Sequence, residues 1–177
     1  MIVALENIWE KVSIVYKVFF VLFTSFLIFL SAQISIDLPF SPVPITLQTF
    51  TIFLLALILP KDWALYSVIT YIAEGAINFP VFANFKGGIW VILGPTGGYI
   101  LSWPLAVIIL KKLLNYMPRF FALIIVSVIV LLCGTLWLSQ FVGINNAFKM
   151  GFLPFLITDF IKVIILSIIS KIISKAS

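Results

Sequence analysis

Two residues of the last apolar segment could bind a polar ligand. Asp159 and Lys162 stand three positions apart in a stretch dominated by Ile, Leu and Phe, and in an α-helix this spacing places them on one face. If the helix begins at Pro154, where a missing N–H is harmless, they lie ~8 Å and ~12 Å below its outer end. A charge inside a membrane-spanning helix costs about 2.5–3.5 kcal/mol on insertion scales, so each needs a reason. The pair predicts either a ligand site with one acceptor and one donor, or an internal ion pair that lowers the cost of burial.

Further polar residues gather at the outward ends of the apolar segments. They are Gln33, Thr46, Gln48, Thr49, Asn84, Thr96 and Tyr99. Nearby aromatic residues would supply apolar walls, namely Phe40, Phe82, Phe85 and Trp90. The threonines could equally cap helices, and Gln48 could hydrogen-bond between helices. Together the set suits a small amphipathic molecule with a ring and a charged tail.

Glu74 lies near the outer end of the third apolar segment. Three roles are open to a carboxylate there: it could reach water, pair with a neighbouring loop or line the pocket. We include it among the candidate ligand-binding residues.

Composition disfavours metal and enzyme chemistry. The chain has no histidine, one cysteine (Cys133) and six acidic residues scattered along it. We therefore expect no metal site, no disulfide and no catalytic cluster of the kind a lipid-modifying membrane enzyme needs. Residues 94–98, Gly-Pro-Thr-Gly-Gly, lack the Gly-Lys-Ser/Thr ending of a phosphate-binding loop, so we expect no ATP hydrolysis by this chain and no cofactor. These glycines could bring backbone close to a ligand or allow tight helix packing.

The elements that position these residues are membrane helices. Hydrophobic residues make up 63% of the 177 residues and charged residues 10%, against roughly 25% charged in a soluble domain. Such a surface must face lipid. The net charge of +5 is then explained by loops facing anionic lipid rather than by nucleic-acid binding. The first apolar run shows no cleavage site, so we expect it to be a retained helix.

A bilayer-spanning helix needs ~20 apolar residues, with ~17 as a working minimum. We expect one integral membrane domain over residues 1–177 with six transmembrane helices, at about residues 17–32, 44–60, 62–78, 95–110, 119–142 and 154–171. With a cytoplasmic N-terminus the inner segments hold eight basic residues, Lys11, Lys17, Lys61, Lys111, Lys112, Arg119, Lys171 and Lys175, and the outer segments hold two, Lys86 and Lys149. This bias predicts that both termini are cytoplasmic. The outer segments, residues 34–44, 78–94 and 143–151, are longer and rich in Pro, Gly and Asn, which is typical of functional loops.

Several short motifs follow one another along residues 31–162. They are Ser-Ala-Gln-Ile-Ser-Ile at 31–36, Pro-Val-Pro-Ile-Thr-Leu-Gln-Thr at 42–49, Gly-Ala-Ile-Asn-Phe-Pro-Val-Phe-Ala at 75–83, Gly-Gly at 87–88, Gly-Pro-Thr-Gly-Gly-Tyr at 94–99, and Gly-Phe-Leu-Pro-Phe at 151–155 with Asp159 and Lys162. In this order and at this spacing they resemble the BioY family.

The resemblance implies a biotin-specific S-component of an energy-coupling factor (ECF) transporter. Such a protein is a bundle of six transmembrane helices in the bacterial plasma (inner) membrane, with an outward pocket capped by the first loop. It works with a transmembrane coupling subunit and two ATPase subunits, although some members act without a dedicated ATPase module. The alternative is an S-component for another vitamin, such as thiamine or riboflavin.

By analogy, Asp159, Lys162 and Asn84 would hold polar groups of biotin, with Tyr99 and Gln48 in support. Thr46, Gln33 and Glu74 complete the expected binding set. The sequence departs from the family in one place. Residues 18–30 are dominated by Phe, Leu and Ile, whereas S-components usually dock their coupling subunit through small residues on this helix.

Overall fold

The computed structural model describes residues 13–175. Its helices are α2 (Ile14–Gln33), α3 (Gln48–Ile58), α4 (Lys61–Ala76), α5 (Ile89–Leu93), α6 (Gly97–Leu113), α7 (Arg119–Val142), α8 (Ile144–Ala147) and α9 (Leu153–Lys175). A 3₁₀ turn, η1 (Ala83–Phe85), precedes α5, and a π-helical turn, η2 (Phe148–Phe152), joins α8 to α9. Two short antiparallel strands, β1 (Ser35–Ile36) and β2 (Ile45–Thr46), form a hairpin in which Ser35 pairs with Thr46.

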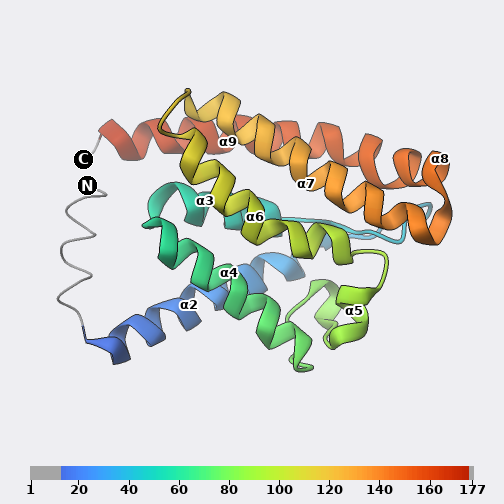
Figure 1. Cartoon of the computed structure of the whole chain (residues 1–177), viewed down its shortest axis with the longest axis horizontal. Coiled ribbons are helices and arrows are strands. Elements are labelled where there is room, and N and C mark those ends of the chain that lie inside the picture. Colours follow the sequence, from blue (N-terminus) through green and yellow to red (C-terminus); the bar gives the residue numbers. More distant parts are fainter. Residues whose placement is uncertain (1–12, 176–177) are drawn as a thin grey trace.

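Helix α6 lies at the centre of the bundle (Figure 1). It packs against α7 on one side and against α4 and α3 on the other, while α2 covers α3 and α4 and α9 covers α7 and α3. The two glycines at the start of α6 allow this closeness, because a Cβ on Gly98 would lie 2.2 Å from Cβ of Trp137 on α7. Gly134 of α7 likewise leaves room for the ring of Tyr99, which a Cβ would approach to 2.1 Å.

Large apolar side chains cover the outside of the bundle, and small polar ones lie inside it. Phe19 of α2 is 70% exposed and Ile157 of α9 is 69% exposed, whereas Thr24 and Ser67 are 2% and 0% exposed. The two buried hydroxyls hydrogen-bond each other across α2 and α4 at 2.6 Å. Such polar groups are expected inside the bundle, among its apolar core residues, since lipid cannot satisfy them.

Three helical stretches of the described chain are long and apolar enough to cross a membrane: Ile14–Gln33, Arg119–Val142 and Ile144–Ile173. The other three expected spans are shorter as helices. The second, expected at residues 44–60, is helical only over the 11 residues Gln48–Ile58, since the chain before it is the extended β2 strand. Proline lacks the N–H and favours extended backbone, so Pro42 and Pro44 delay the helix. Likewise α6 begins only at Gly97, and residues 94–96 separate it from the short helix α5.

The connections divide between two ends of the bundle (Figure 1). The start of α2, the α3–α4 turn, the α6–α7 connection and the end of α9 share one end. The β1–β2 hairpin, α5 and α8 share the other. The three segments expected on the outer side of the membrane are therefore gathered at one end.

Basic residues of the opposite end hydrogen-bond helix carbonyls. Lys111 donates to the Leu59 carbonyl, and Arg119 donates to the Ser170 carbonyl at 2.6 Å. Cations are favourable near helix C-termini, where carbonyls lack partners. Lys11, counted among the inner basic residues, lies outside the described residues.

Candidate ligand-binding site

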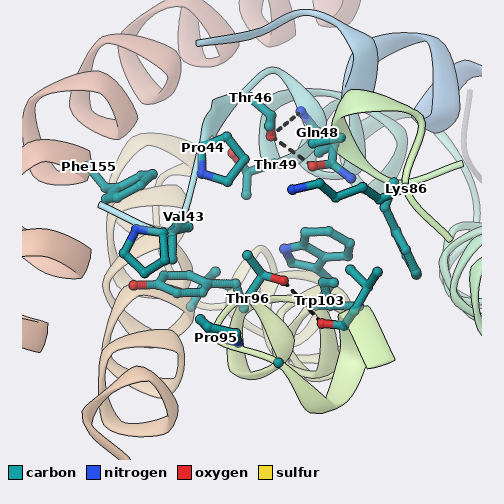
Figure 2. A pocket seen from close by; sticks show the side chains of 18 of the residues that line it. Val43, Pro44, Thr46, Gln48, Thr49, Lys86, Pro95, Thr96, Trp103 and Phe155 are labelled. Atoms are coloured by element: carbon teal, nitrogen blue, oxygen red, sulfur yellow. Dashed lines mark hydrogen bonds between the residues drawn. The ribbon is translucent and has the colours of Figure 1, made fainter. Parts of the chain in front are cut away.

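A cavity of about 200 Å³ opens among the hairpin loop, η1, α3, α6, α7 and α9 (Figure 2). Its walls mix aromatic and aliphatic side chains with a few polar ones. The lining residues are Pro42, Val43, Pro44, Thr46, Gln48, Thr49, Phe82, Ala83, Lys86, Trp90, Val91, Gly94, Pro95, Thr96, Tyr99, Ile100, Trp103, Val130, Leu131, Phe155, Asp159 and Lys162. Five of the eight candidate residues are among them: Thr46, Gln48, Tyr99, Asp159 and Lys162.

Asp159 and Lys162 lie together in the wall formed by α9. The Lys162 ammonium donates to Oδ1 of Asp159 at 2.8 Å and to Oγ1 of Thr49 on α3 at 2.9 Å. Ser127 of α7 donates to Oδ2 of Asp159 at 3.4 Å. The side chains are 7% and 12% exposed for Asp159 and Lys162. Asp159 and Lys162 form an internal ion pair and also border the cavity. This geometry is compatible with a ligand site as well as with an ion pair that lowers the cost of burial.

Gln48 is held by a short chain of hydrogen bonds at the start of α3. Thr46 donates to its carbonyl oxygen at 2.9 Å, and its amide donates to the Tyr71 hydroxyl at 2.6 Å. Tyr71 donates in turn to the Val81 carbonyl at 2.8 Å. Since an amide nitrogen carries two hydrogens, Gln48 keeps one donor beyond those bonds, and its side chain borders the cavity.

Tyr99 offers the cavity its ring. Its hydroxyl donates to the Gly151 carbonyl at 2.7 Å, in the π-helical turn. The ring centroid lies 6.0 Å from that of Phe155, and both side chains border the cavity. The sequence suggested a supporting polar role for Tyr99, but this hydrogen bond commits its hydroxyl to the protein.

Asn84 does not line the cavity. Its backbone is left-handed (φ 58°), and its amide nitrogen donates to Asp37 at 2.9 Å while its oxygen accepts from Ser35 at 3.0 Å. Asn tolerates this conformation because its short polar side chain bonds locally. The structure therefore places Asn84 between the hairpin and η1 rather than in the cavity lining, and its contact with a ligand stays a prediction.

Gln33 also lies outside the cavity lining. Its amide donates to the Phe82 carbonyl at 3.1 Å, and its oxygen accepts from the Phe85 N–H at 3.0 Å. It therefore anchors the segment around η1 to the end of α2. Of the four aromatic residues expected in the walls, Phe82 and Trp90 line the cavity and Phe40 and Phe85 do not.

Glu74 borders a different groove. It accepts a hydrogen bond from Ser25 of α2 at 2.6 Å. The groove is lined by Phe26, Phe29, Glu74, Phe79, Pro80 and Val81, so Glu74 is separate from the cavity that contains Asp159.

The glycine-rich segment at the start of α6 borders the cavity and also allows close packing. Gly94 and its neighbours Pro95 and Thr96 line the cavity. A Cβ on Gly97 would lie 1.7 Å from the Ile92 carbonyl oxygen, so this glycine serves packing.

Trp103 and Lys86 line the cavity but were not among the candidate binding residues. Trp103 is 3% exposed, and its indole N–H is buried with no hydrogen-bond partner among the described residues. The only sequence signal is its spacing four residues after Tyr99, which places both on one helix face. Lys86 entered only as an outer basic residue, although its side chain borders the cavity.

The family model described as "BioY family" matches residues 6–177. A probable biotin transporter BioY of Pyrococcus horikoshii is 42% identical over 134 residues, which cover 74% of this chain and 79% of the relative. The biotin transporter BioY of Thermotoga maritima is 38% identical over 145 residues, covering 79% of this chain and 86% of the relative.

A solved structure has the same fold. It is a crystal structure of the S-component for biotin from an ECF-type ABC transporter. The TM-score is 0.77 at 28% sequence identity, covering 91% of this chain and 92% of that one. The expected helical bundle of the S-component type is confirmed.

Proposed function

This chain belongs to the BioY family, and from that premise we propose that the cavity among α3, α6 and α9 is its biotin-binding site. The protein is a multi-pass membrane protein and a biotin transporter, the S-component of an ECF-type ABC transporter, rather than an enzyme. The observation that carries the site is the charged pair Asp159–Lys162, buried in the wall of an otherwise largely apolar cavity.

The chemistry of biotin matches the groups that border this cavity. Biotin has a fused ureido ring with N–H donors and a carbonyl acceptor, an apolar thioether ring, and a carboxylate on a flexible tail. Asp159 is the acceptor for a ureido N–H, while Lys162 and Gln48 are donors for its oxygen atoms. The rings of Tyr99, Phe155 and Trp103 and the edges of Pro42 and Pro44 form apolar surface for the ring system.

The three expected residues outside the cavity support it indirectly in this proposal. Asn84 and Gln33 hold η1 and the hairpin around the mouth through their hydrogen bonds. Glu74 joins α2 to α4 through Ser25. Thr46, which borders the cavity itself, orients the Gln48 amide.

For the membrane arrangement we propose the plasma membrane with both termini cytoplasmic. The basic residues Lys111 and Arg119 lie at the end of the bundle opposite the hairpin (Figure 1), in agreement with the bias of cytoplasmic loops toward Lys and Arg. The cavity mouth would then face outward. We propose that a coupling subunit and two ATPase subunits move biotin inward, in keeping with the lack of a phosphate-binding loop ending in Gly-Lys-Ser/Thr in this sequence.

Isothermal titration of the purified protein with biotin tests the site. We expect submicromolar affinity for the wild type, and a loss of about 1–3 kcal/mol of binding free energy in Asp159→Asn or Lys162→Ala if the charged groups contact biotin. Asp62→Asn, at the start of α4 in the opposite end of the bundle, is the control and should bind like the wild type. Competition with thiamine and riboflavin separates biotin from the other vitamins.

The double variant Asp159→Asn/Lys162→Met separates a ligand role from a purely structural one. If the pair only lowers its own burial cost, the neutral double variant should fold and bind biotin like the wild type. Unchanged affinity in a folded double variant, or no biotin affinity below the micromolar range in the wild type, would contradict the proposed site.

A further inference from the structure

The π-helical turn η2 stands directly before the part of α9 that forms the cavity wall. In this turn the Leu153 N–H bonds the Phe148 carbonyl, which lies five residues back instead of four. The sequence supplies the cause. Pro154 has no N–H, and in a regular α-helix its ring would clash with the carbonyl four residues earlier. The Gly-Phe-Leu-Pro-Phe motif at 151–155 therefore marks a change of helical register, a feature that is frequent at functional sites.

The π-turn decides which face of α9 the cavity meets. It holds one residue more than an α-helical turn, and one residue corresponds to a rotation of about 100° about the helix axis. Both α8 and η2 pack against α7, so the segment before α9 is held in place. Phe155, Asp159 and Lys162 follow one another at spacings of four and three residues, and all three line the cavity. In an uninterrupted α-helix this face would be turned away from the cavity by that angle.

Tyr99 holds the turn from α6. Its hydroxyl donates to the Gly151 carbonyl at 2.7 Å, and the bond is buried. A larger residue would not fit at position 151, because a Cβ there would lie 2.5 Å from the Tyr99 hydroxyl oxygen and 2.6 Å from Cδ2 of Leu138. Gly134 of α7 makes room for the Tyr99 ring in the same way. The hydroxyl is thus fixed in space by close packing on α7, and it fixes the turn in its place.

We propose that Tyr99 is a positioning residue for biotin binding: its hydroxyl holds the π-helical turn, and the turn presents Phe155 and Asp159 to the cavity. This inference rests on the proposed function. The hydroxyl acts through Gly151, because its one proton is donated to that carbonyl. A role confined to the ring in the cavity wall would need no hydroxyl, and phenylalanine would serve equally well.

Tyr99→Phe tests this role, since it removes the hydroxyl and keeps the ring. Spin labels at Phe23→Cys of α2 and Ile157→Cys of α9, in a Cys133→Ala background, report the position of α9 by electron paramagnetic resonance. Both sites are exposed and lie on opposite sides of the bundle (Figure 1). Without ligand we expect a narrow distance distribution in the wild type and a shifted or broadened one in Tyr99→Phe. Biotin affinity should fall by roughly three- to tenfold, because only molecules with α9 in place can bind.

Tyr71→Phe is the matched control. It also removes a tyrosine hydroxyl that donates to a backbone carbonyl, but this bond joins α4 to Val81, so the distance to α9 should match that of the wild type. A second pair of labels, at Phe23→Cys and Leu136→Cys on the exposed face of α7, should keep its distance in Tyr99→Phe and shows that the variant is folded.

Two results would overturn the positioning role of Tyr99. One is a wild-type distance to α9 in Tyr99→Phe, and the other is a changed distance with unchanged biotin affinity. A wild type that binds no biotin, while Tyr99→Phe still changes the distance to α9, would contradict the proposed function and not the hold of Tyr99 on this helix.

Discussion

At the scale of single residues, Trp103 stands out because its indole N–H has no hydrogen-bond partner in the part of the chain that the structure describes. This N–H group is buried, and the Trp103 side chain borders the cavity. Leaving a buried donor unsatisfied costs about 1–3 kcal/mol, and most buried polar groups in native structures have partners. A ligand that accepts a hydrogen bond would remove this cost. Trp103 is therefore a binding donor in our interpretation, with its ring 6.2 Å from that of Tyr71.

Replacing Trp103 with Phe tests this role, since the change removes the N–H and keeps an aromatic ring. We expect biotin affinity to fall by about 1–2 kcal/mol, because a hydrogen bond to the ligand is lost. The unfolding temperature of the ligand-free protein should stay unchanged, or fall by less than in the control variant Trp137→Phe. The measurements are titration calorimetry and thermal unfolding without ligand.

Trp137→Phe is the matched control for stability. Its N–H donates to the Gly94 carbonyl at 2.9 Å, so its loss breaks an existing hydrogen bond and should lower the unfolding temperature of the ligand-free protein. Should Trp103→Phe destabilise the ligand-free protein as much as Trp137→Phe and leave affinity unchanged, Trp103 would serve structure alone.

At the scale of elements, the hairpin is held over the cavity by contacts outside it. The loop between β1 and β2 supplies Pro42, Val43 and Pro44 to the cavity wall. Asn84 binds this hairpin through Asp37 and Ser35. We interpret Asn84 as the residue that latches the hairpin to η1, where sequence reasoning had predicted a direct ligand contact.

A double-mutant cycle separates a latch from a ligand contact. Asn84→Gly keeps the left-handed backbone and removes the side chain, and Asp37→Ala removes its partner. For a latch, both single variants should speed biotin dissociation by a similar factor of about 2–10, as expected for an exposed hydrogen bond, and the double variant should show no further effect. Dissociation rates from stopped-flow or surface binding report this directly. A loss confined to Asn84→Gly, with normal rates in Asp37→Ala, would restore Asn84 as a ligand.

Helix α2 shows how one element divides its two faces. Its small residues Thr24, Ser25 and Ala32 are buried, whereas Phe19 and Phe23 are 70% and 50% exposed. Since the small residues are used within the bundle, a partner subunit approaching α2 from the membrane would meet mainly bulky apolar side chains. The departure noted in residues 18–30 therefore concerns the outer face of this helix.

At the scale of the whole molecule, the exposed apolar surface and the separation of loops define a membrane protein with two distinct ends (Figure 1). The hairpin and η1 surround the cavity at one end. The basic contacts of Lys111 and Arg119 lie at the other. The direction in which these ends face is a proposal that charge bias supports.

Cysteine labelling in intact cells tests that direction. In a Cys133→Ala background, a membrane-impermeant maleimide should label Asn146→Cys without permeabilisation, because Asn146 is exposed at the hairpin end. Asn115→Cys, exposed in the α6–α7 connection, should be labelled only after permeabilisation. The reverse pattern would place the cavity mouth in the cytoplasm and contradict the proposed orientation.

The sequence by itself determined the class of protein and pointed to the charged pair that borders the cavity. Composition required a surface that faces lipid, and the resemblance of ordered motifs predicted the family and the helical bundle. The pairing of Asp159 with Lys162 was predictable because it depends on spacing along one helix, which is a local property. The outer segments were recognised as a group by their composition.

The tertiary structure decided which of the outer polar residues face the cavity. Gln33, Glu74 and Asn84 have suitable side chains at a suitable depth, yet their hydrogen bonds go to Phe82, Ser25 and Asp37. Trp103 and Lys86 line the cavity although neither belongs to a recognisable motif. The physical reason is that periodicity within a helix fixes which residues are neighbours along it, whereas the direction a side chain takes relative to distant segments depends on how those helices pack.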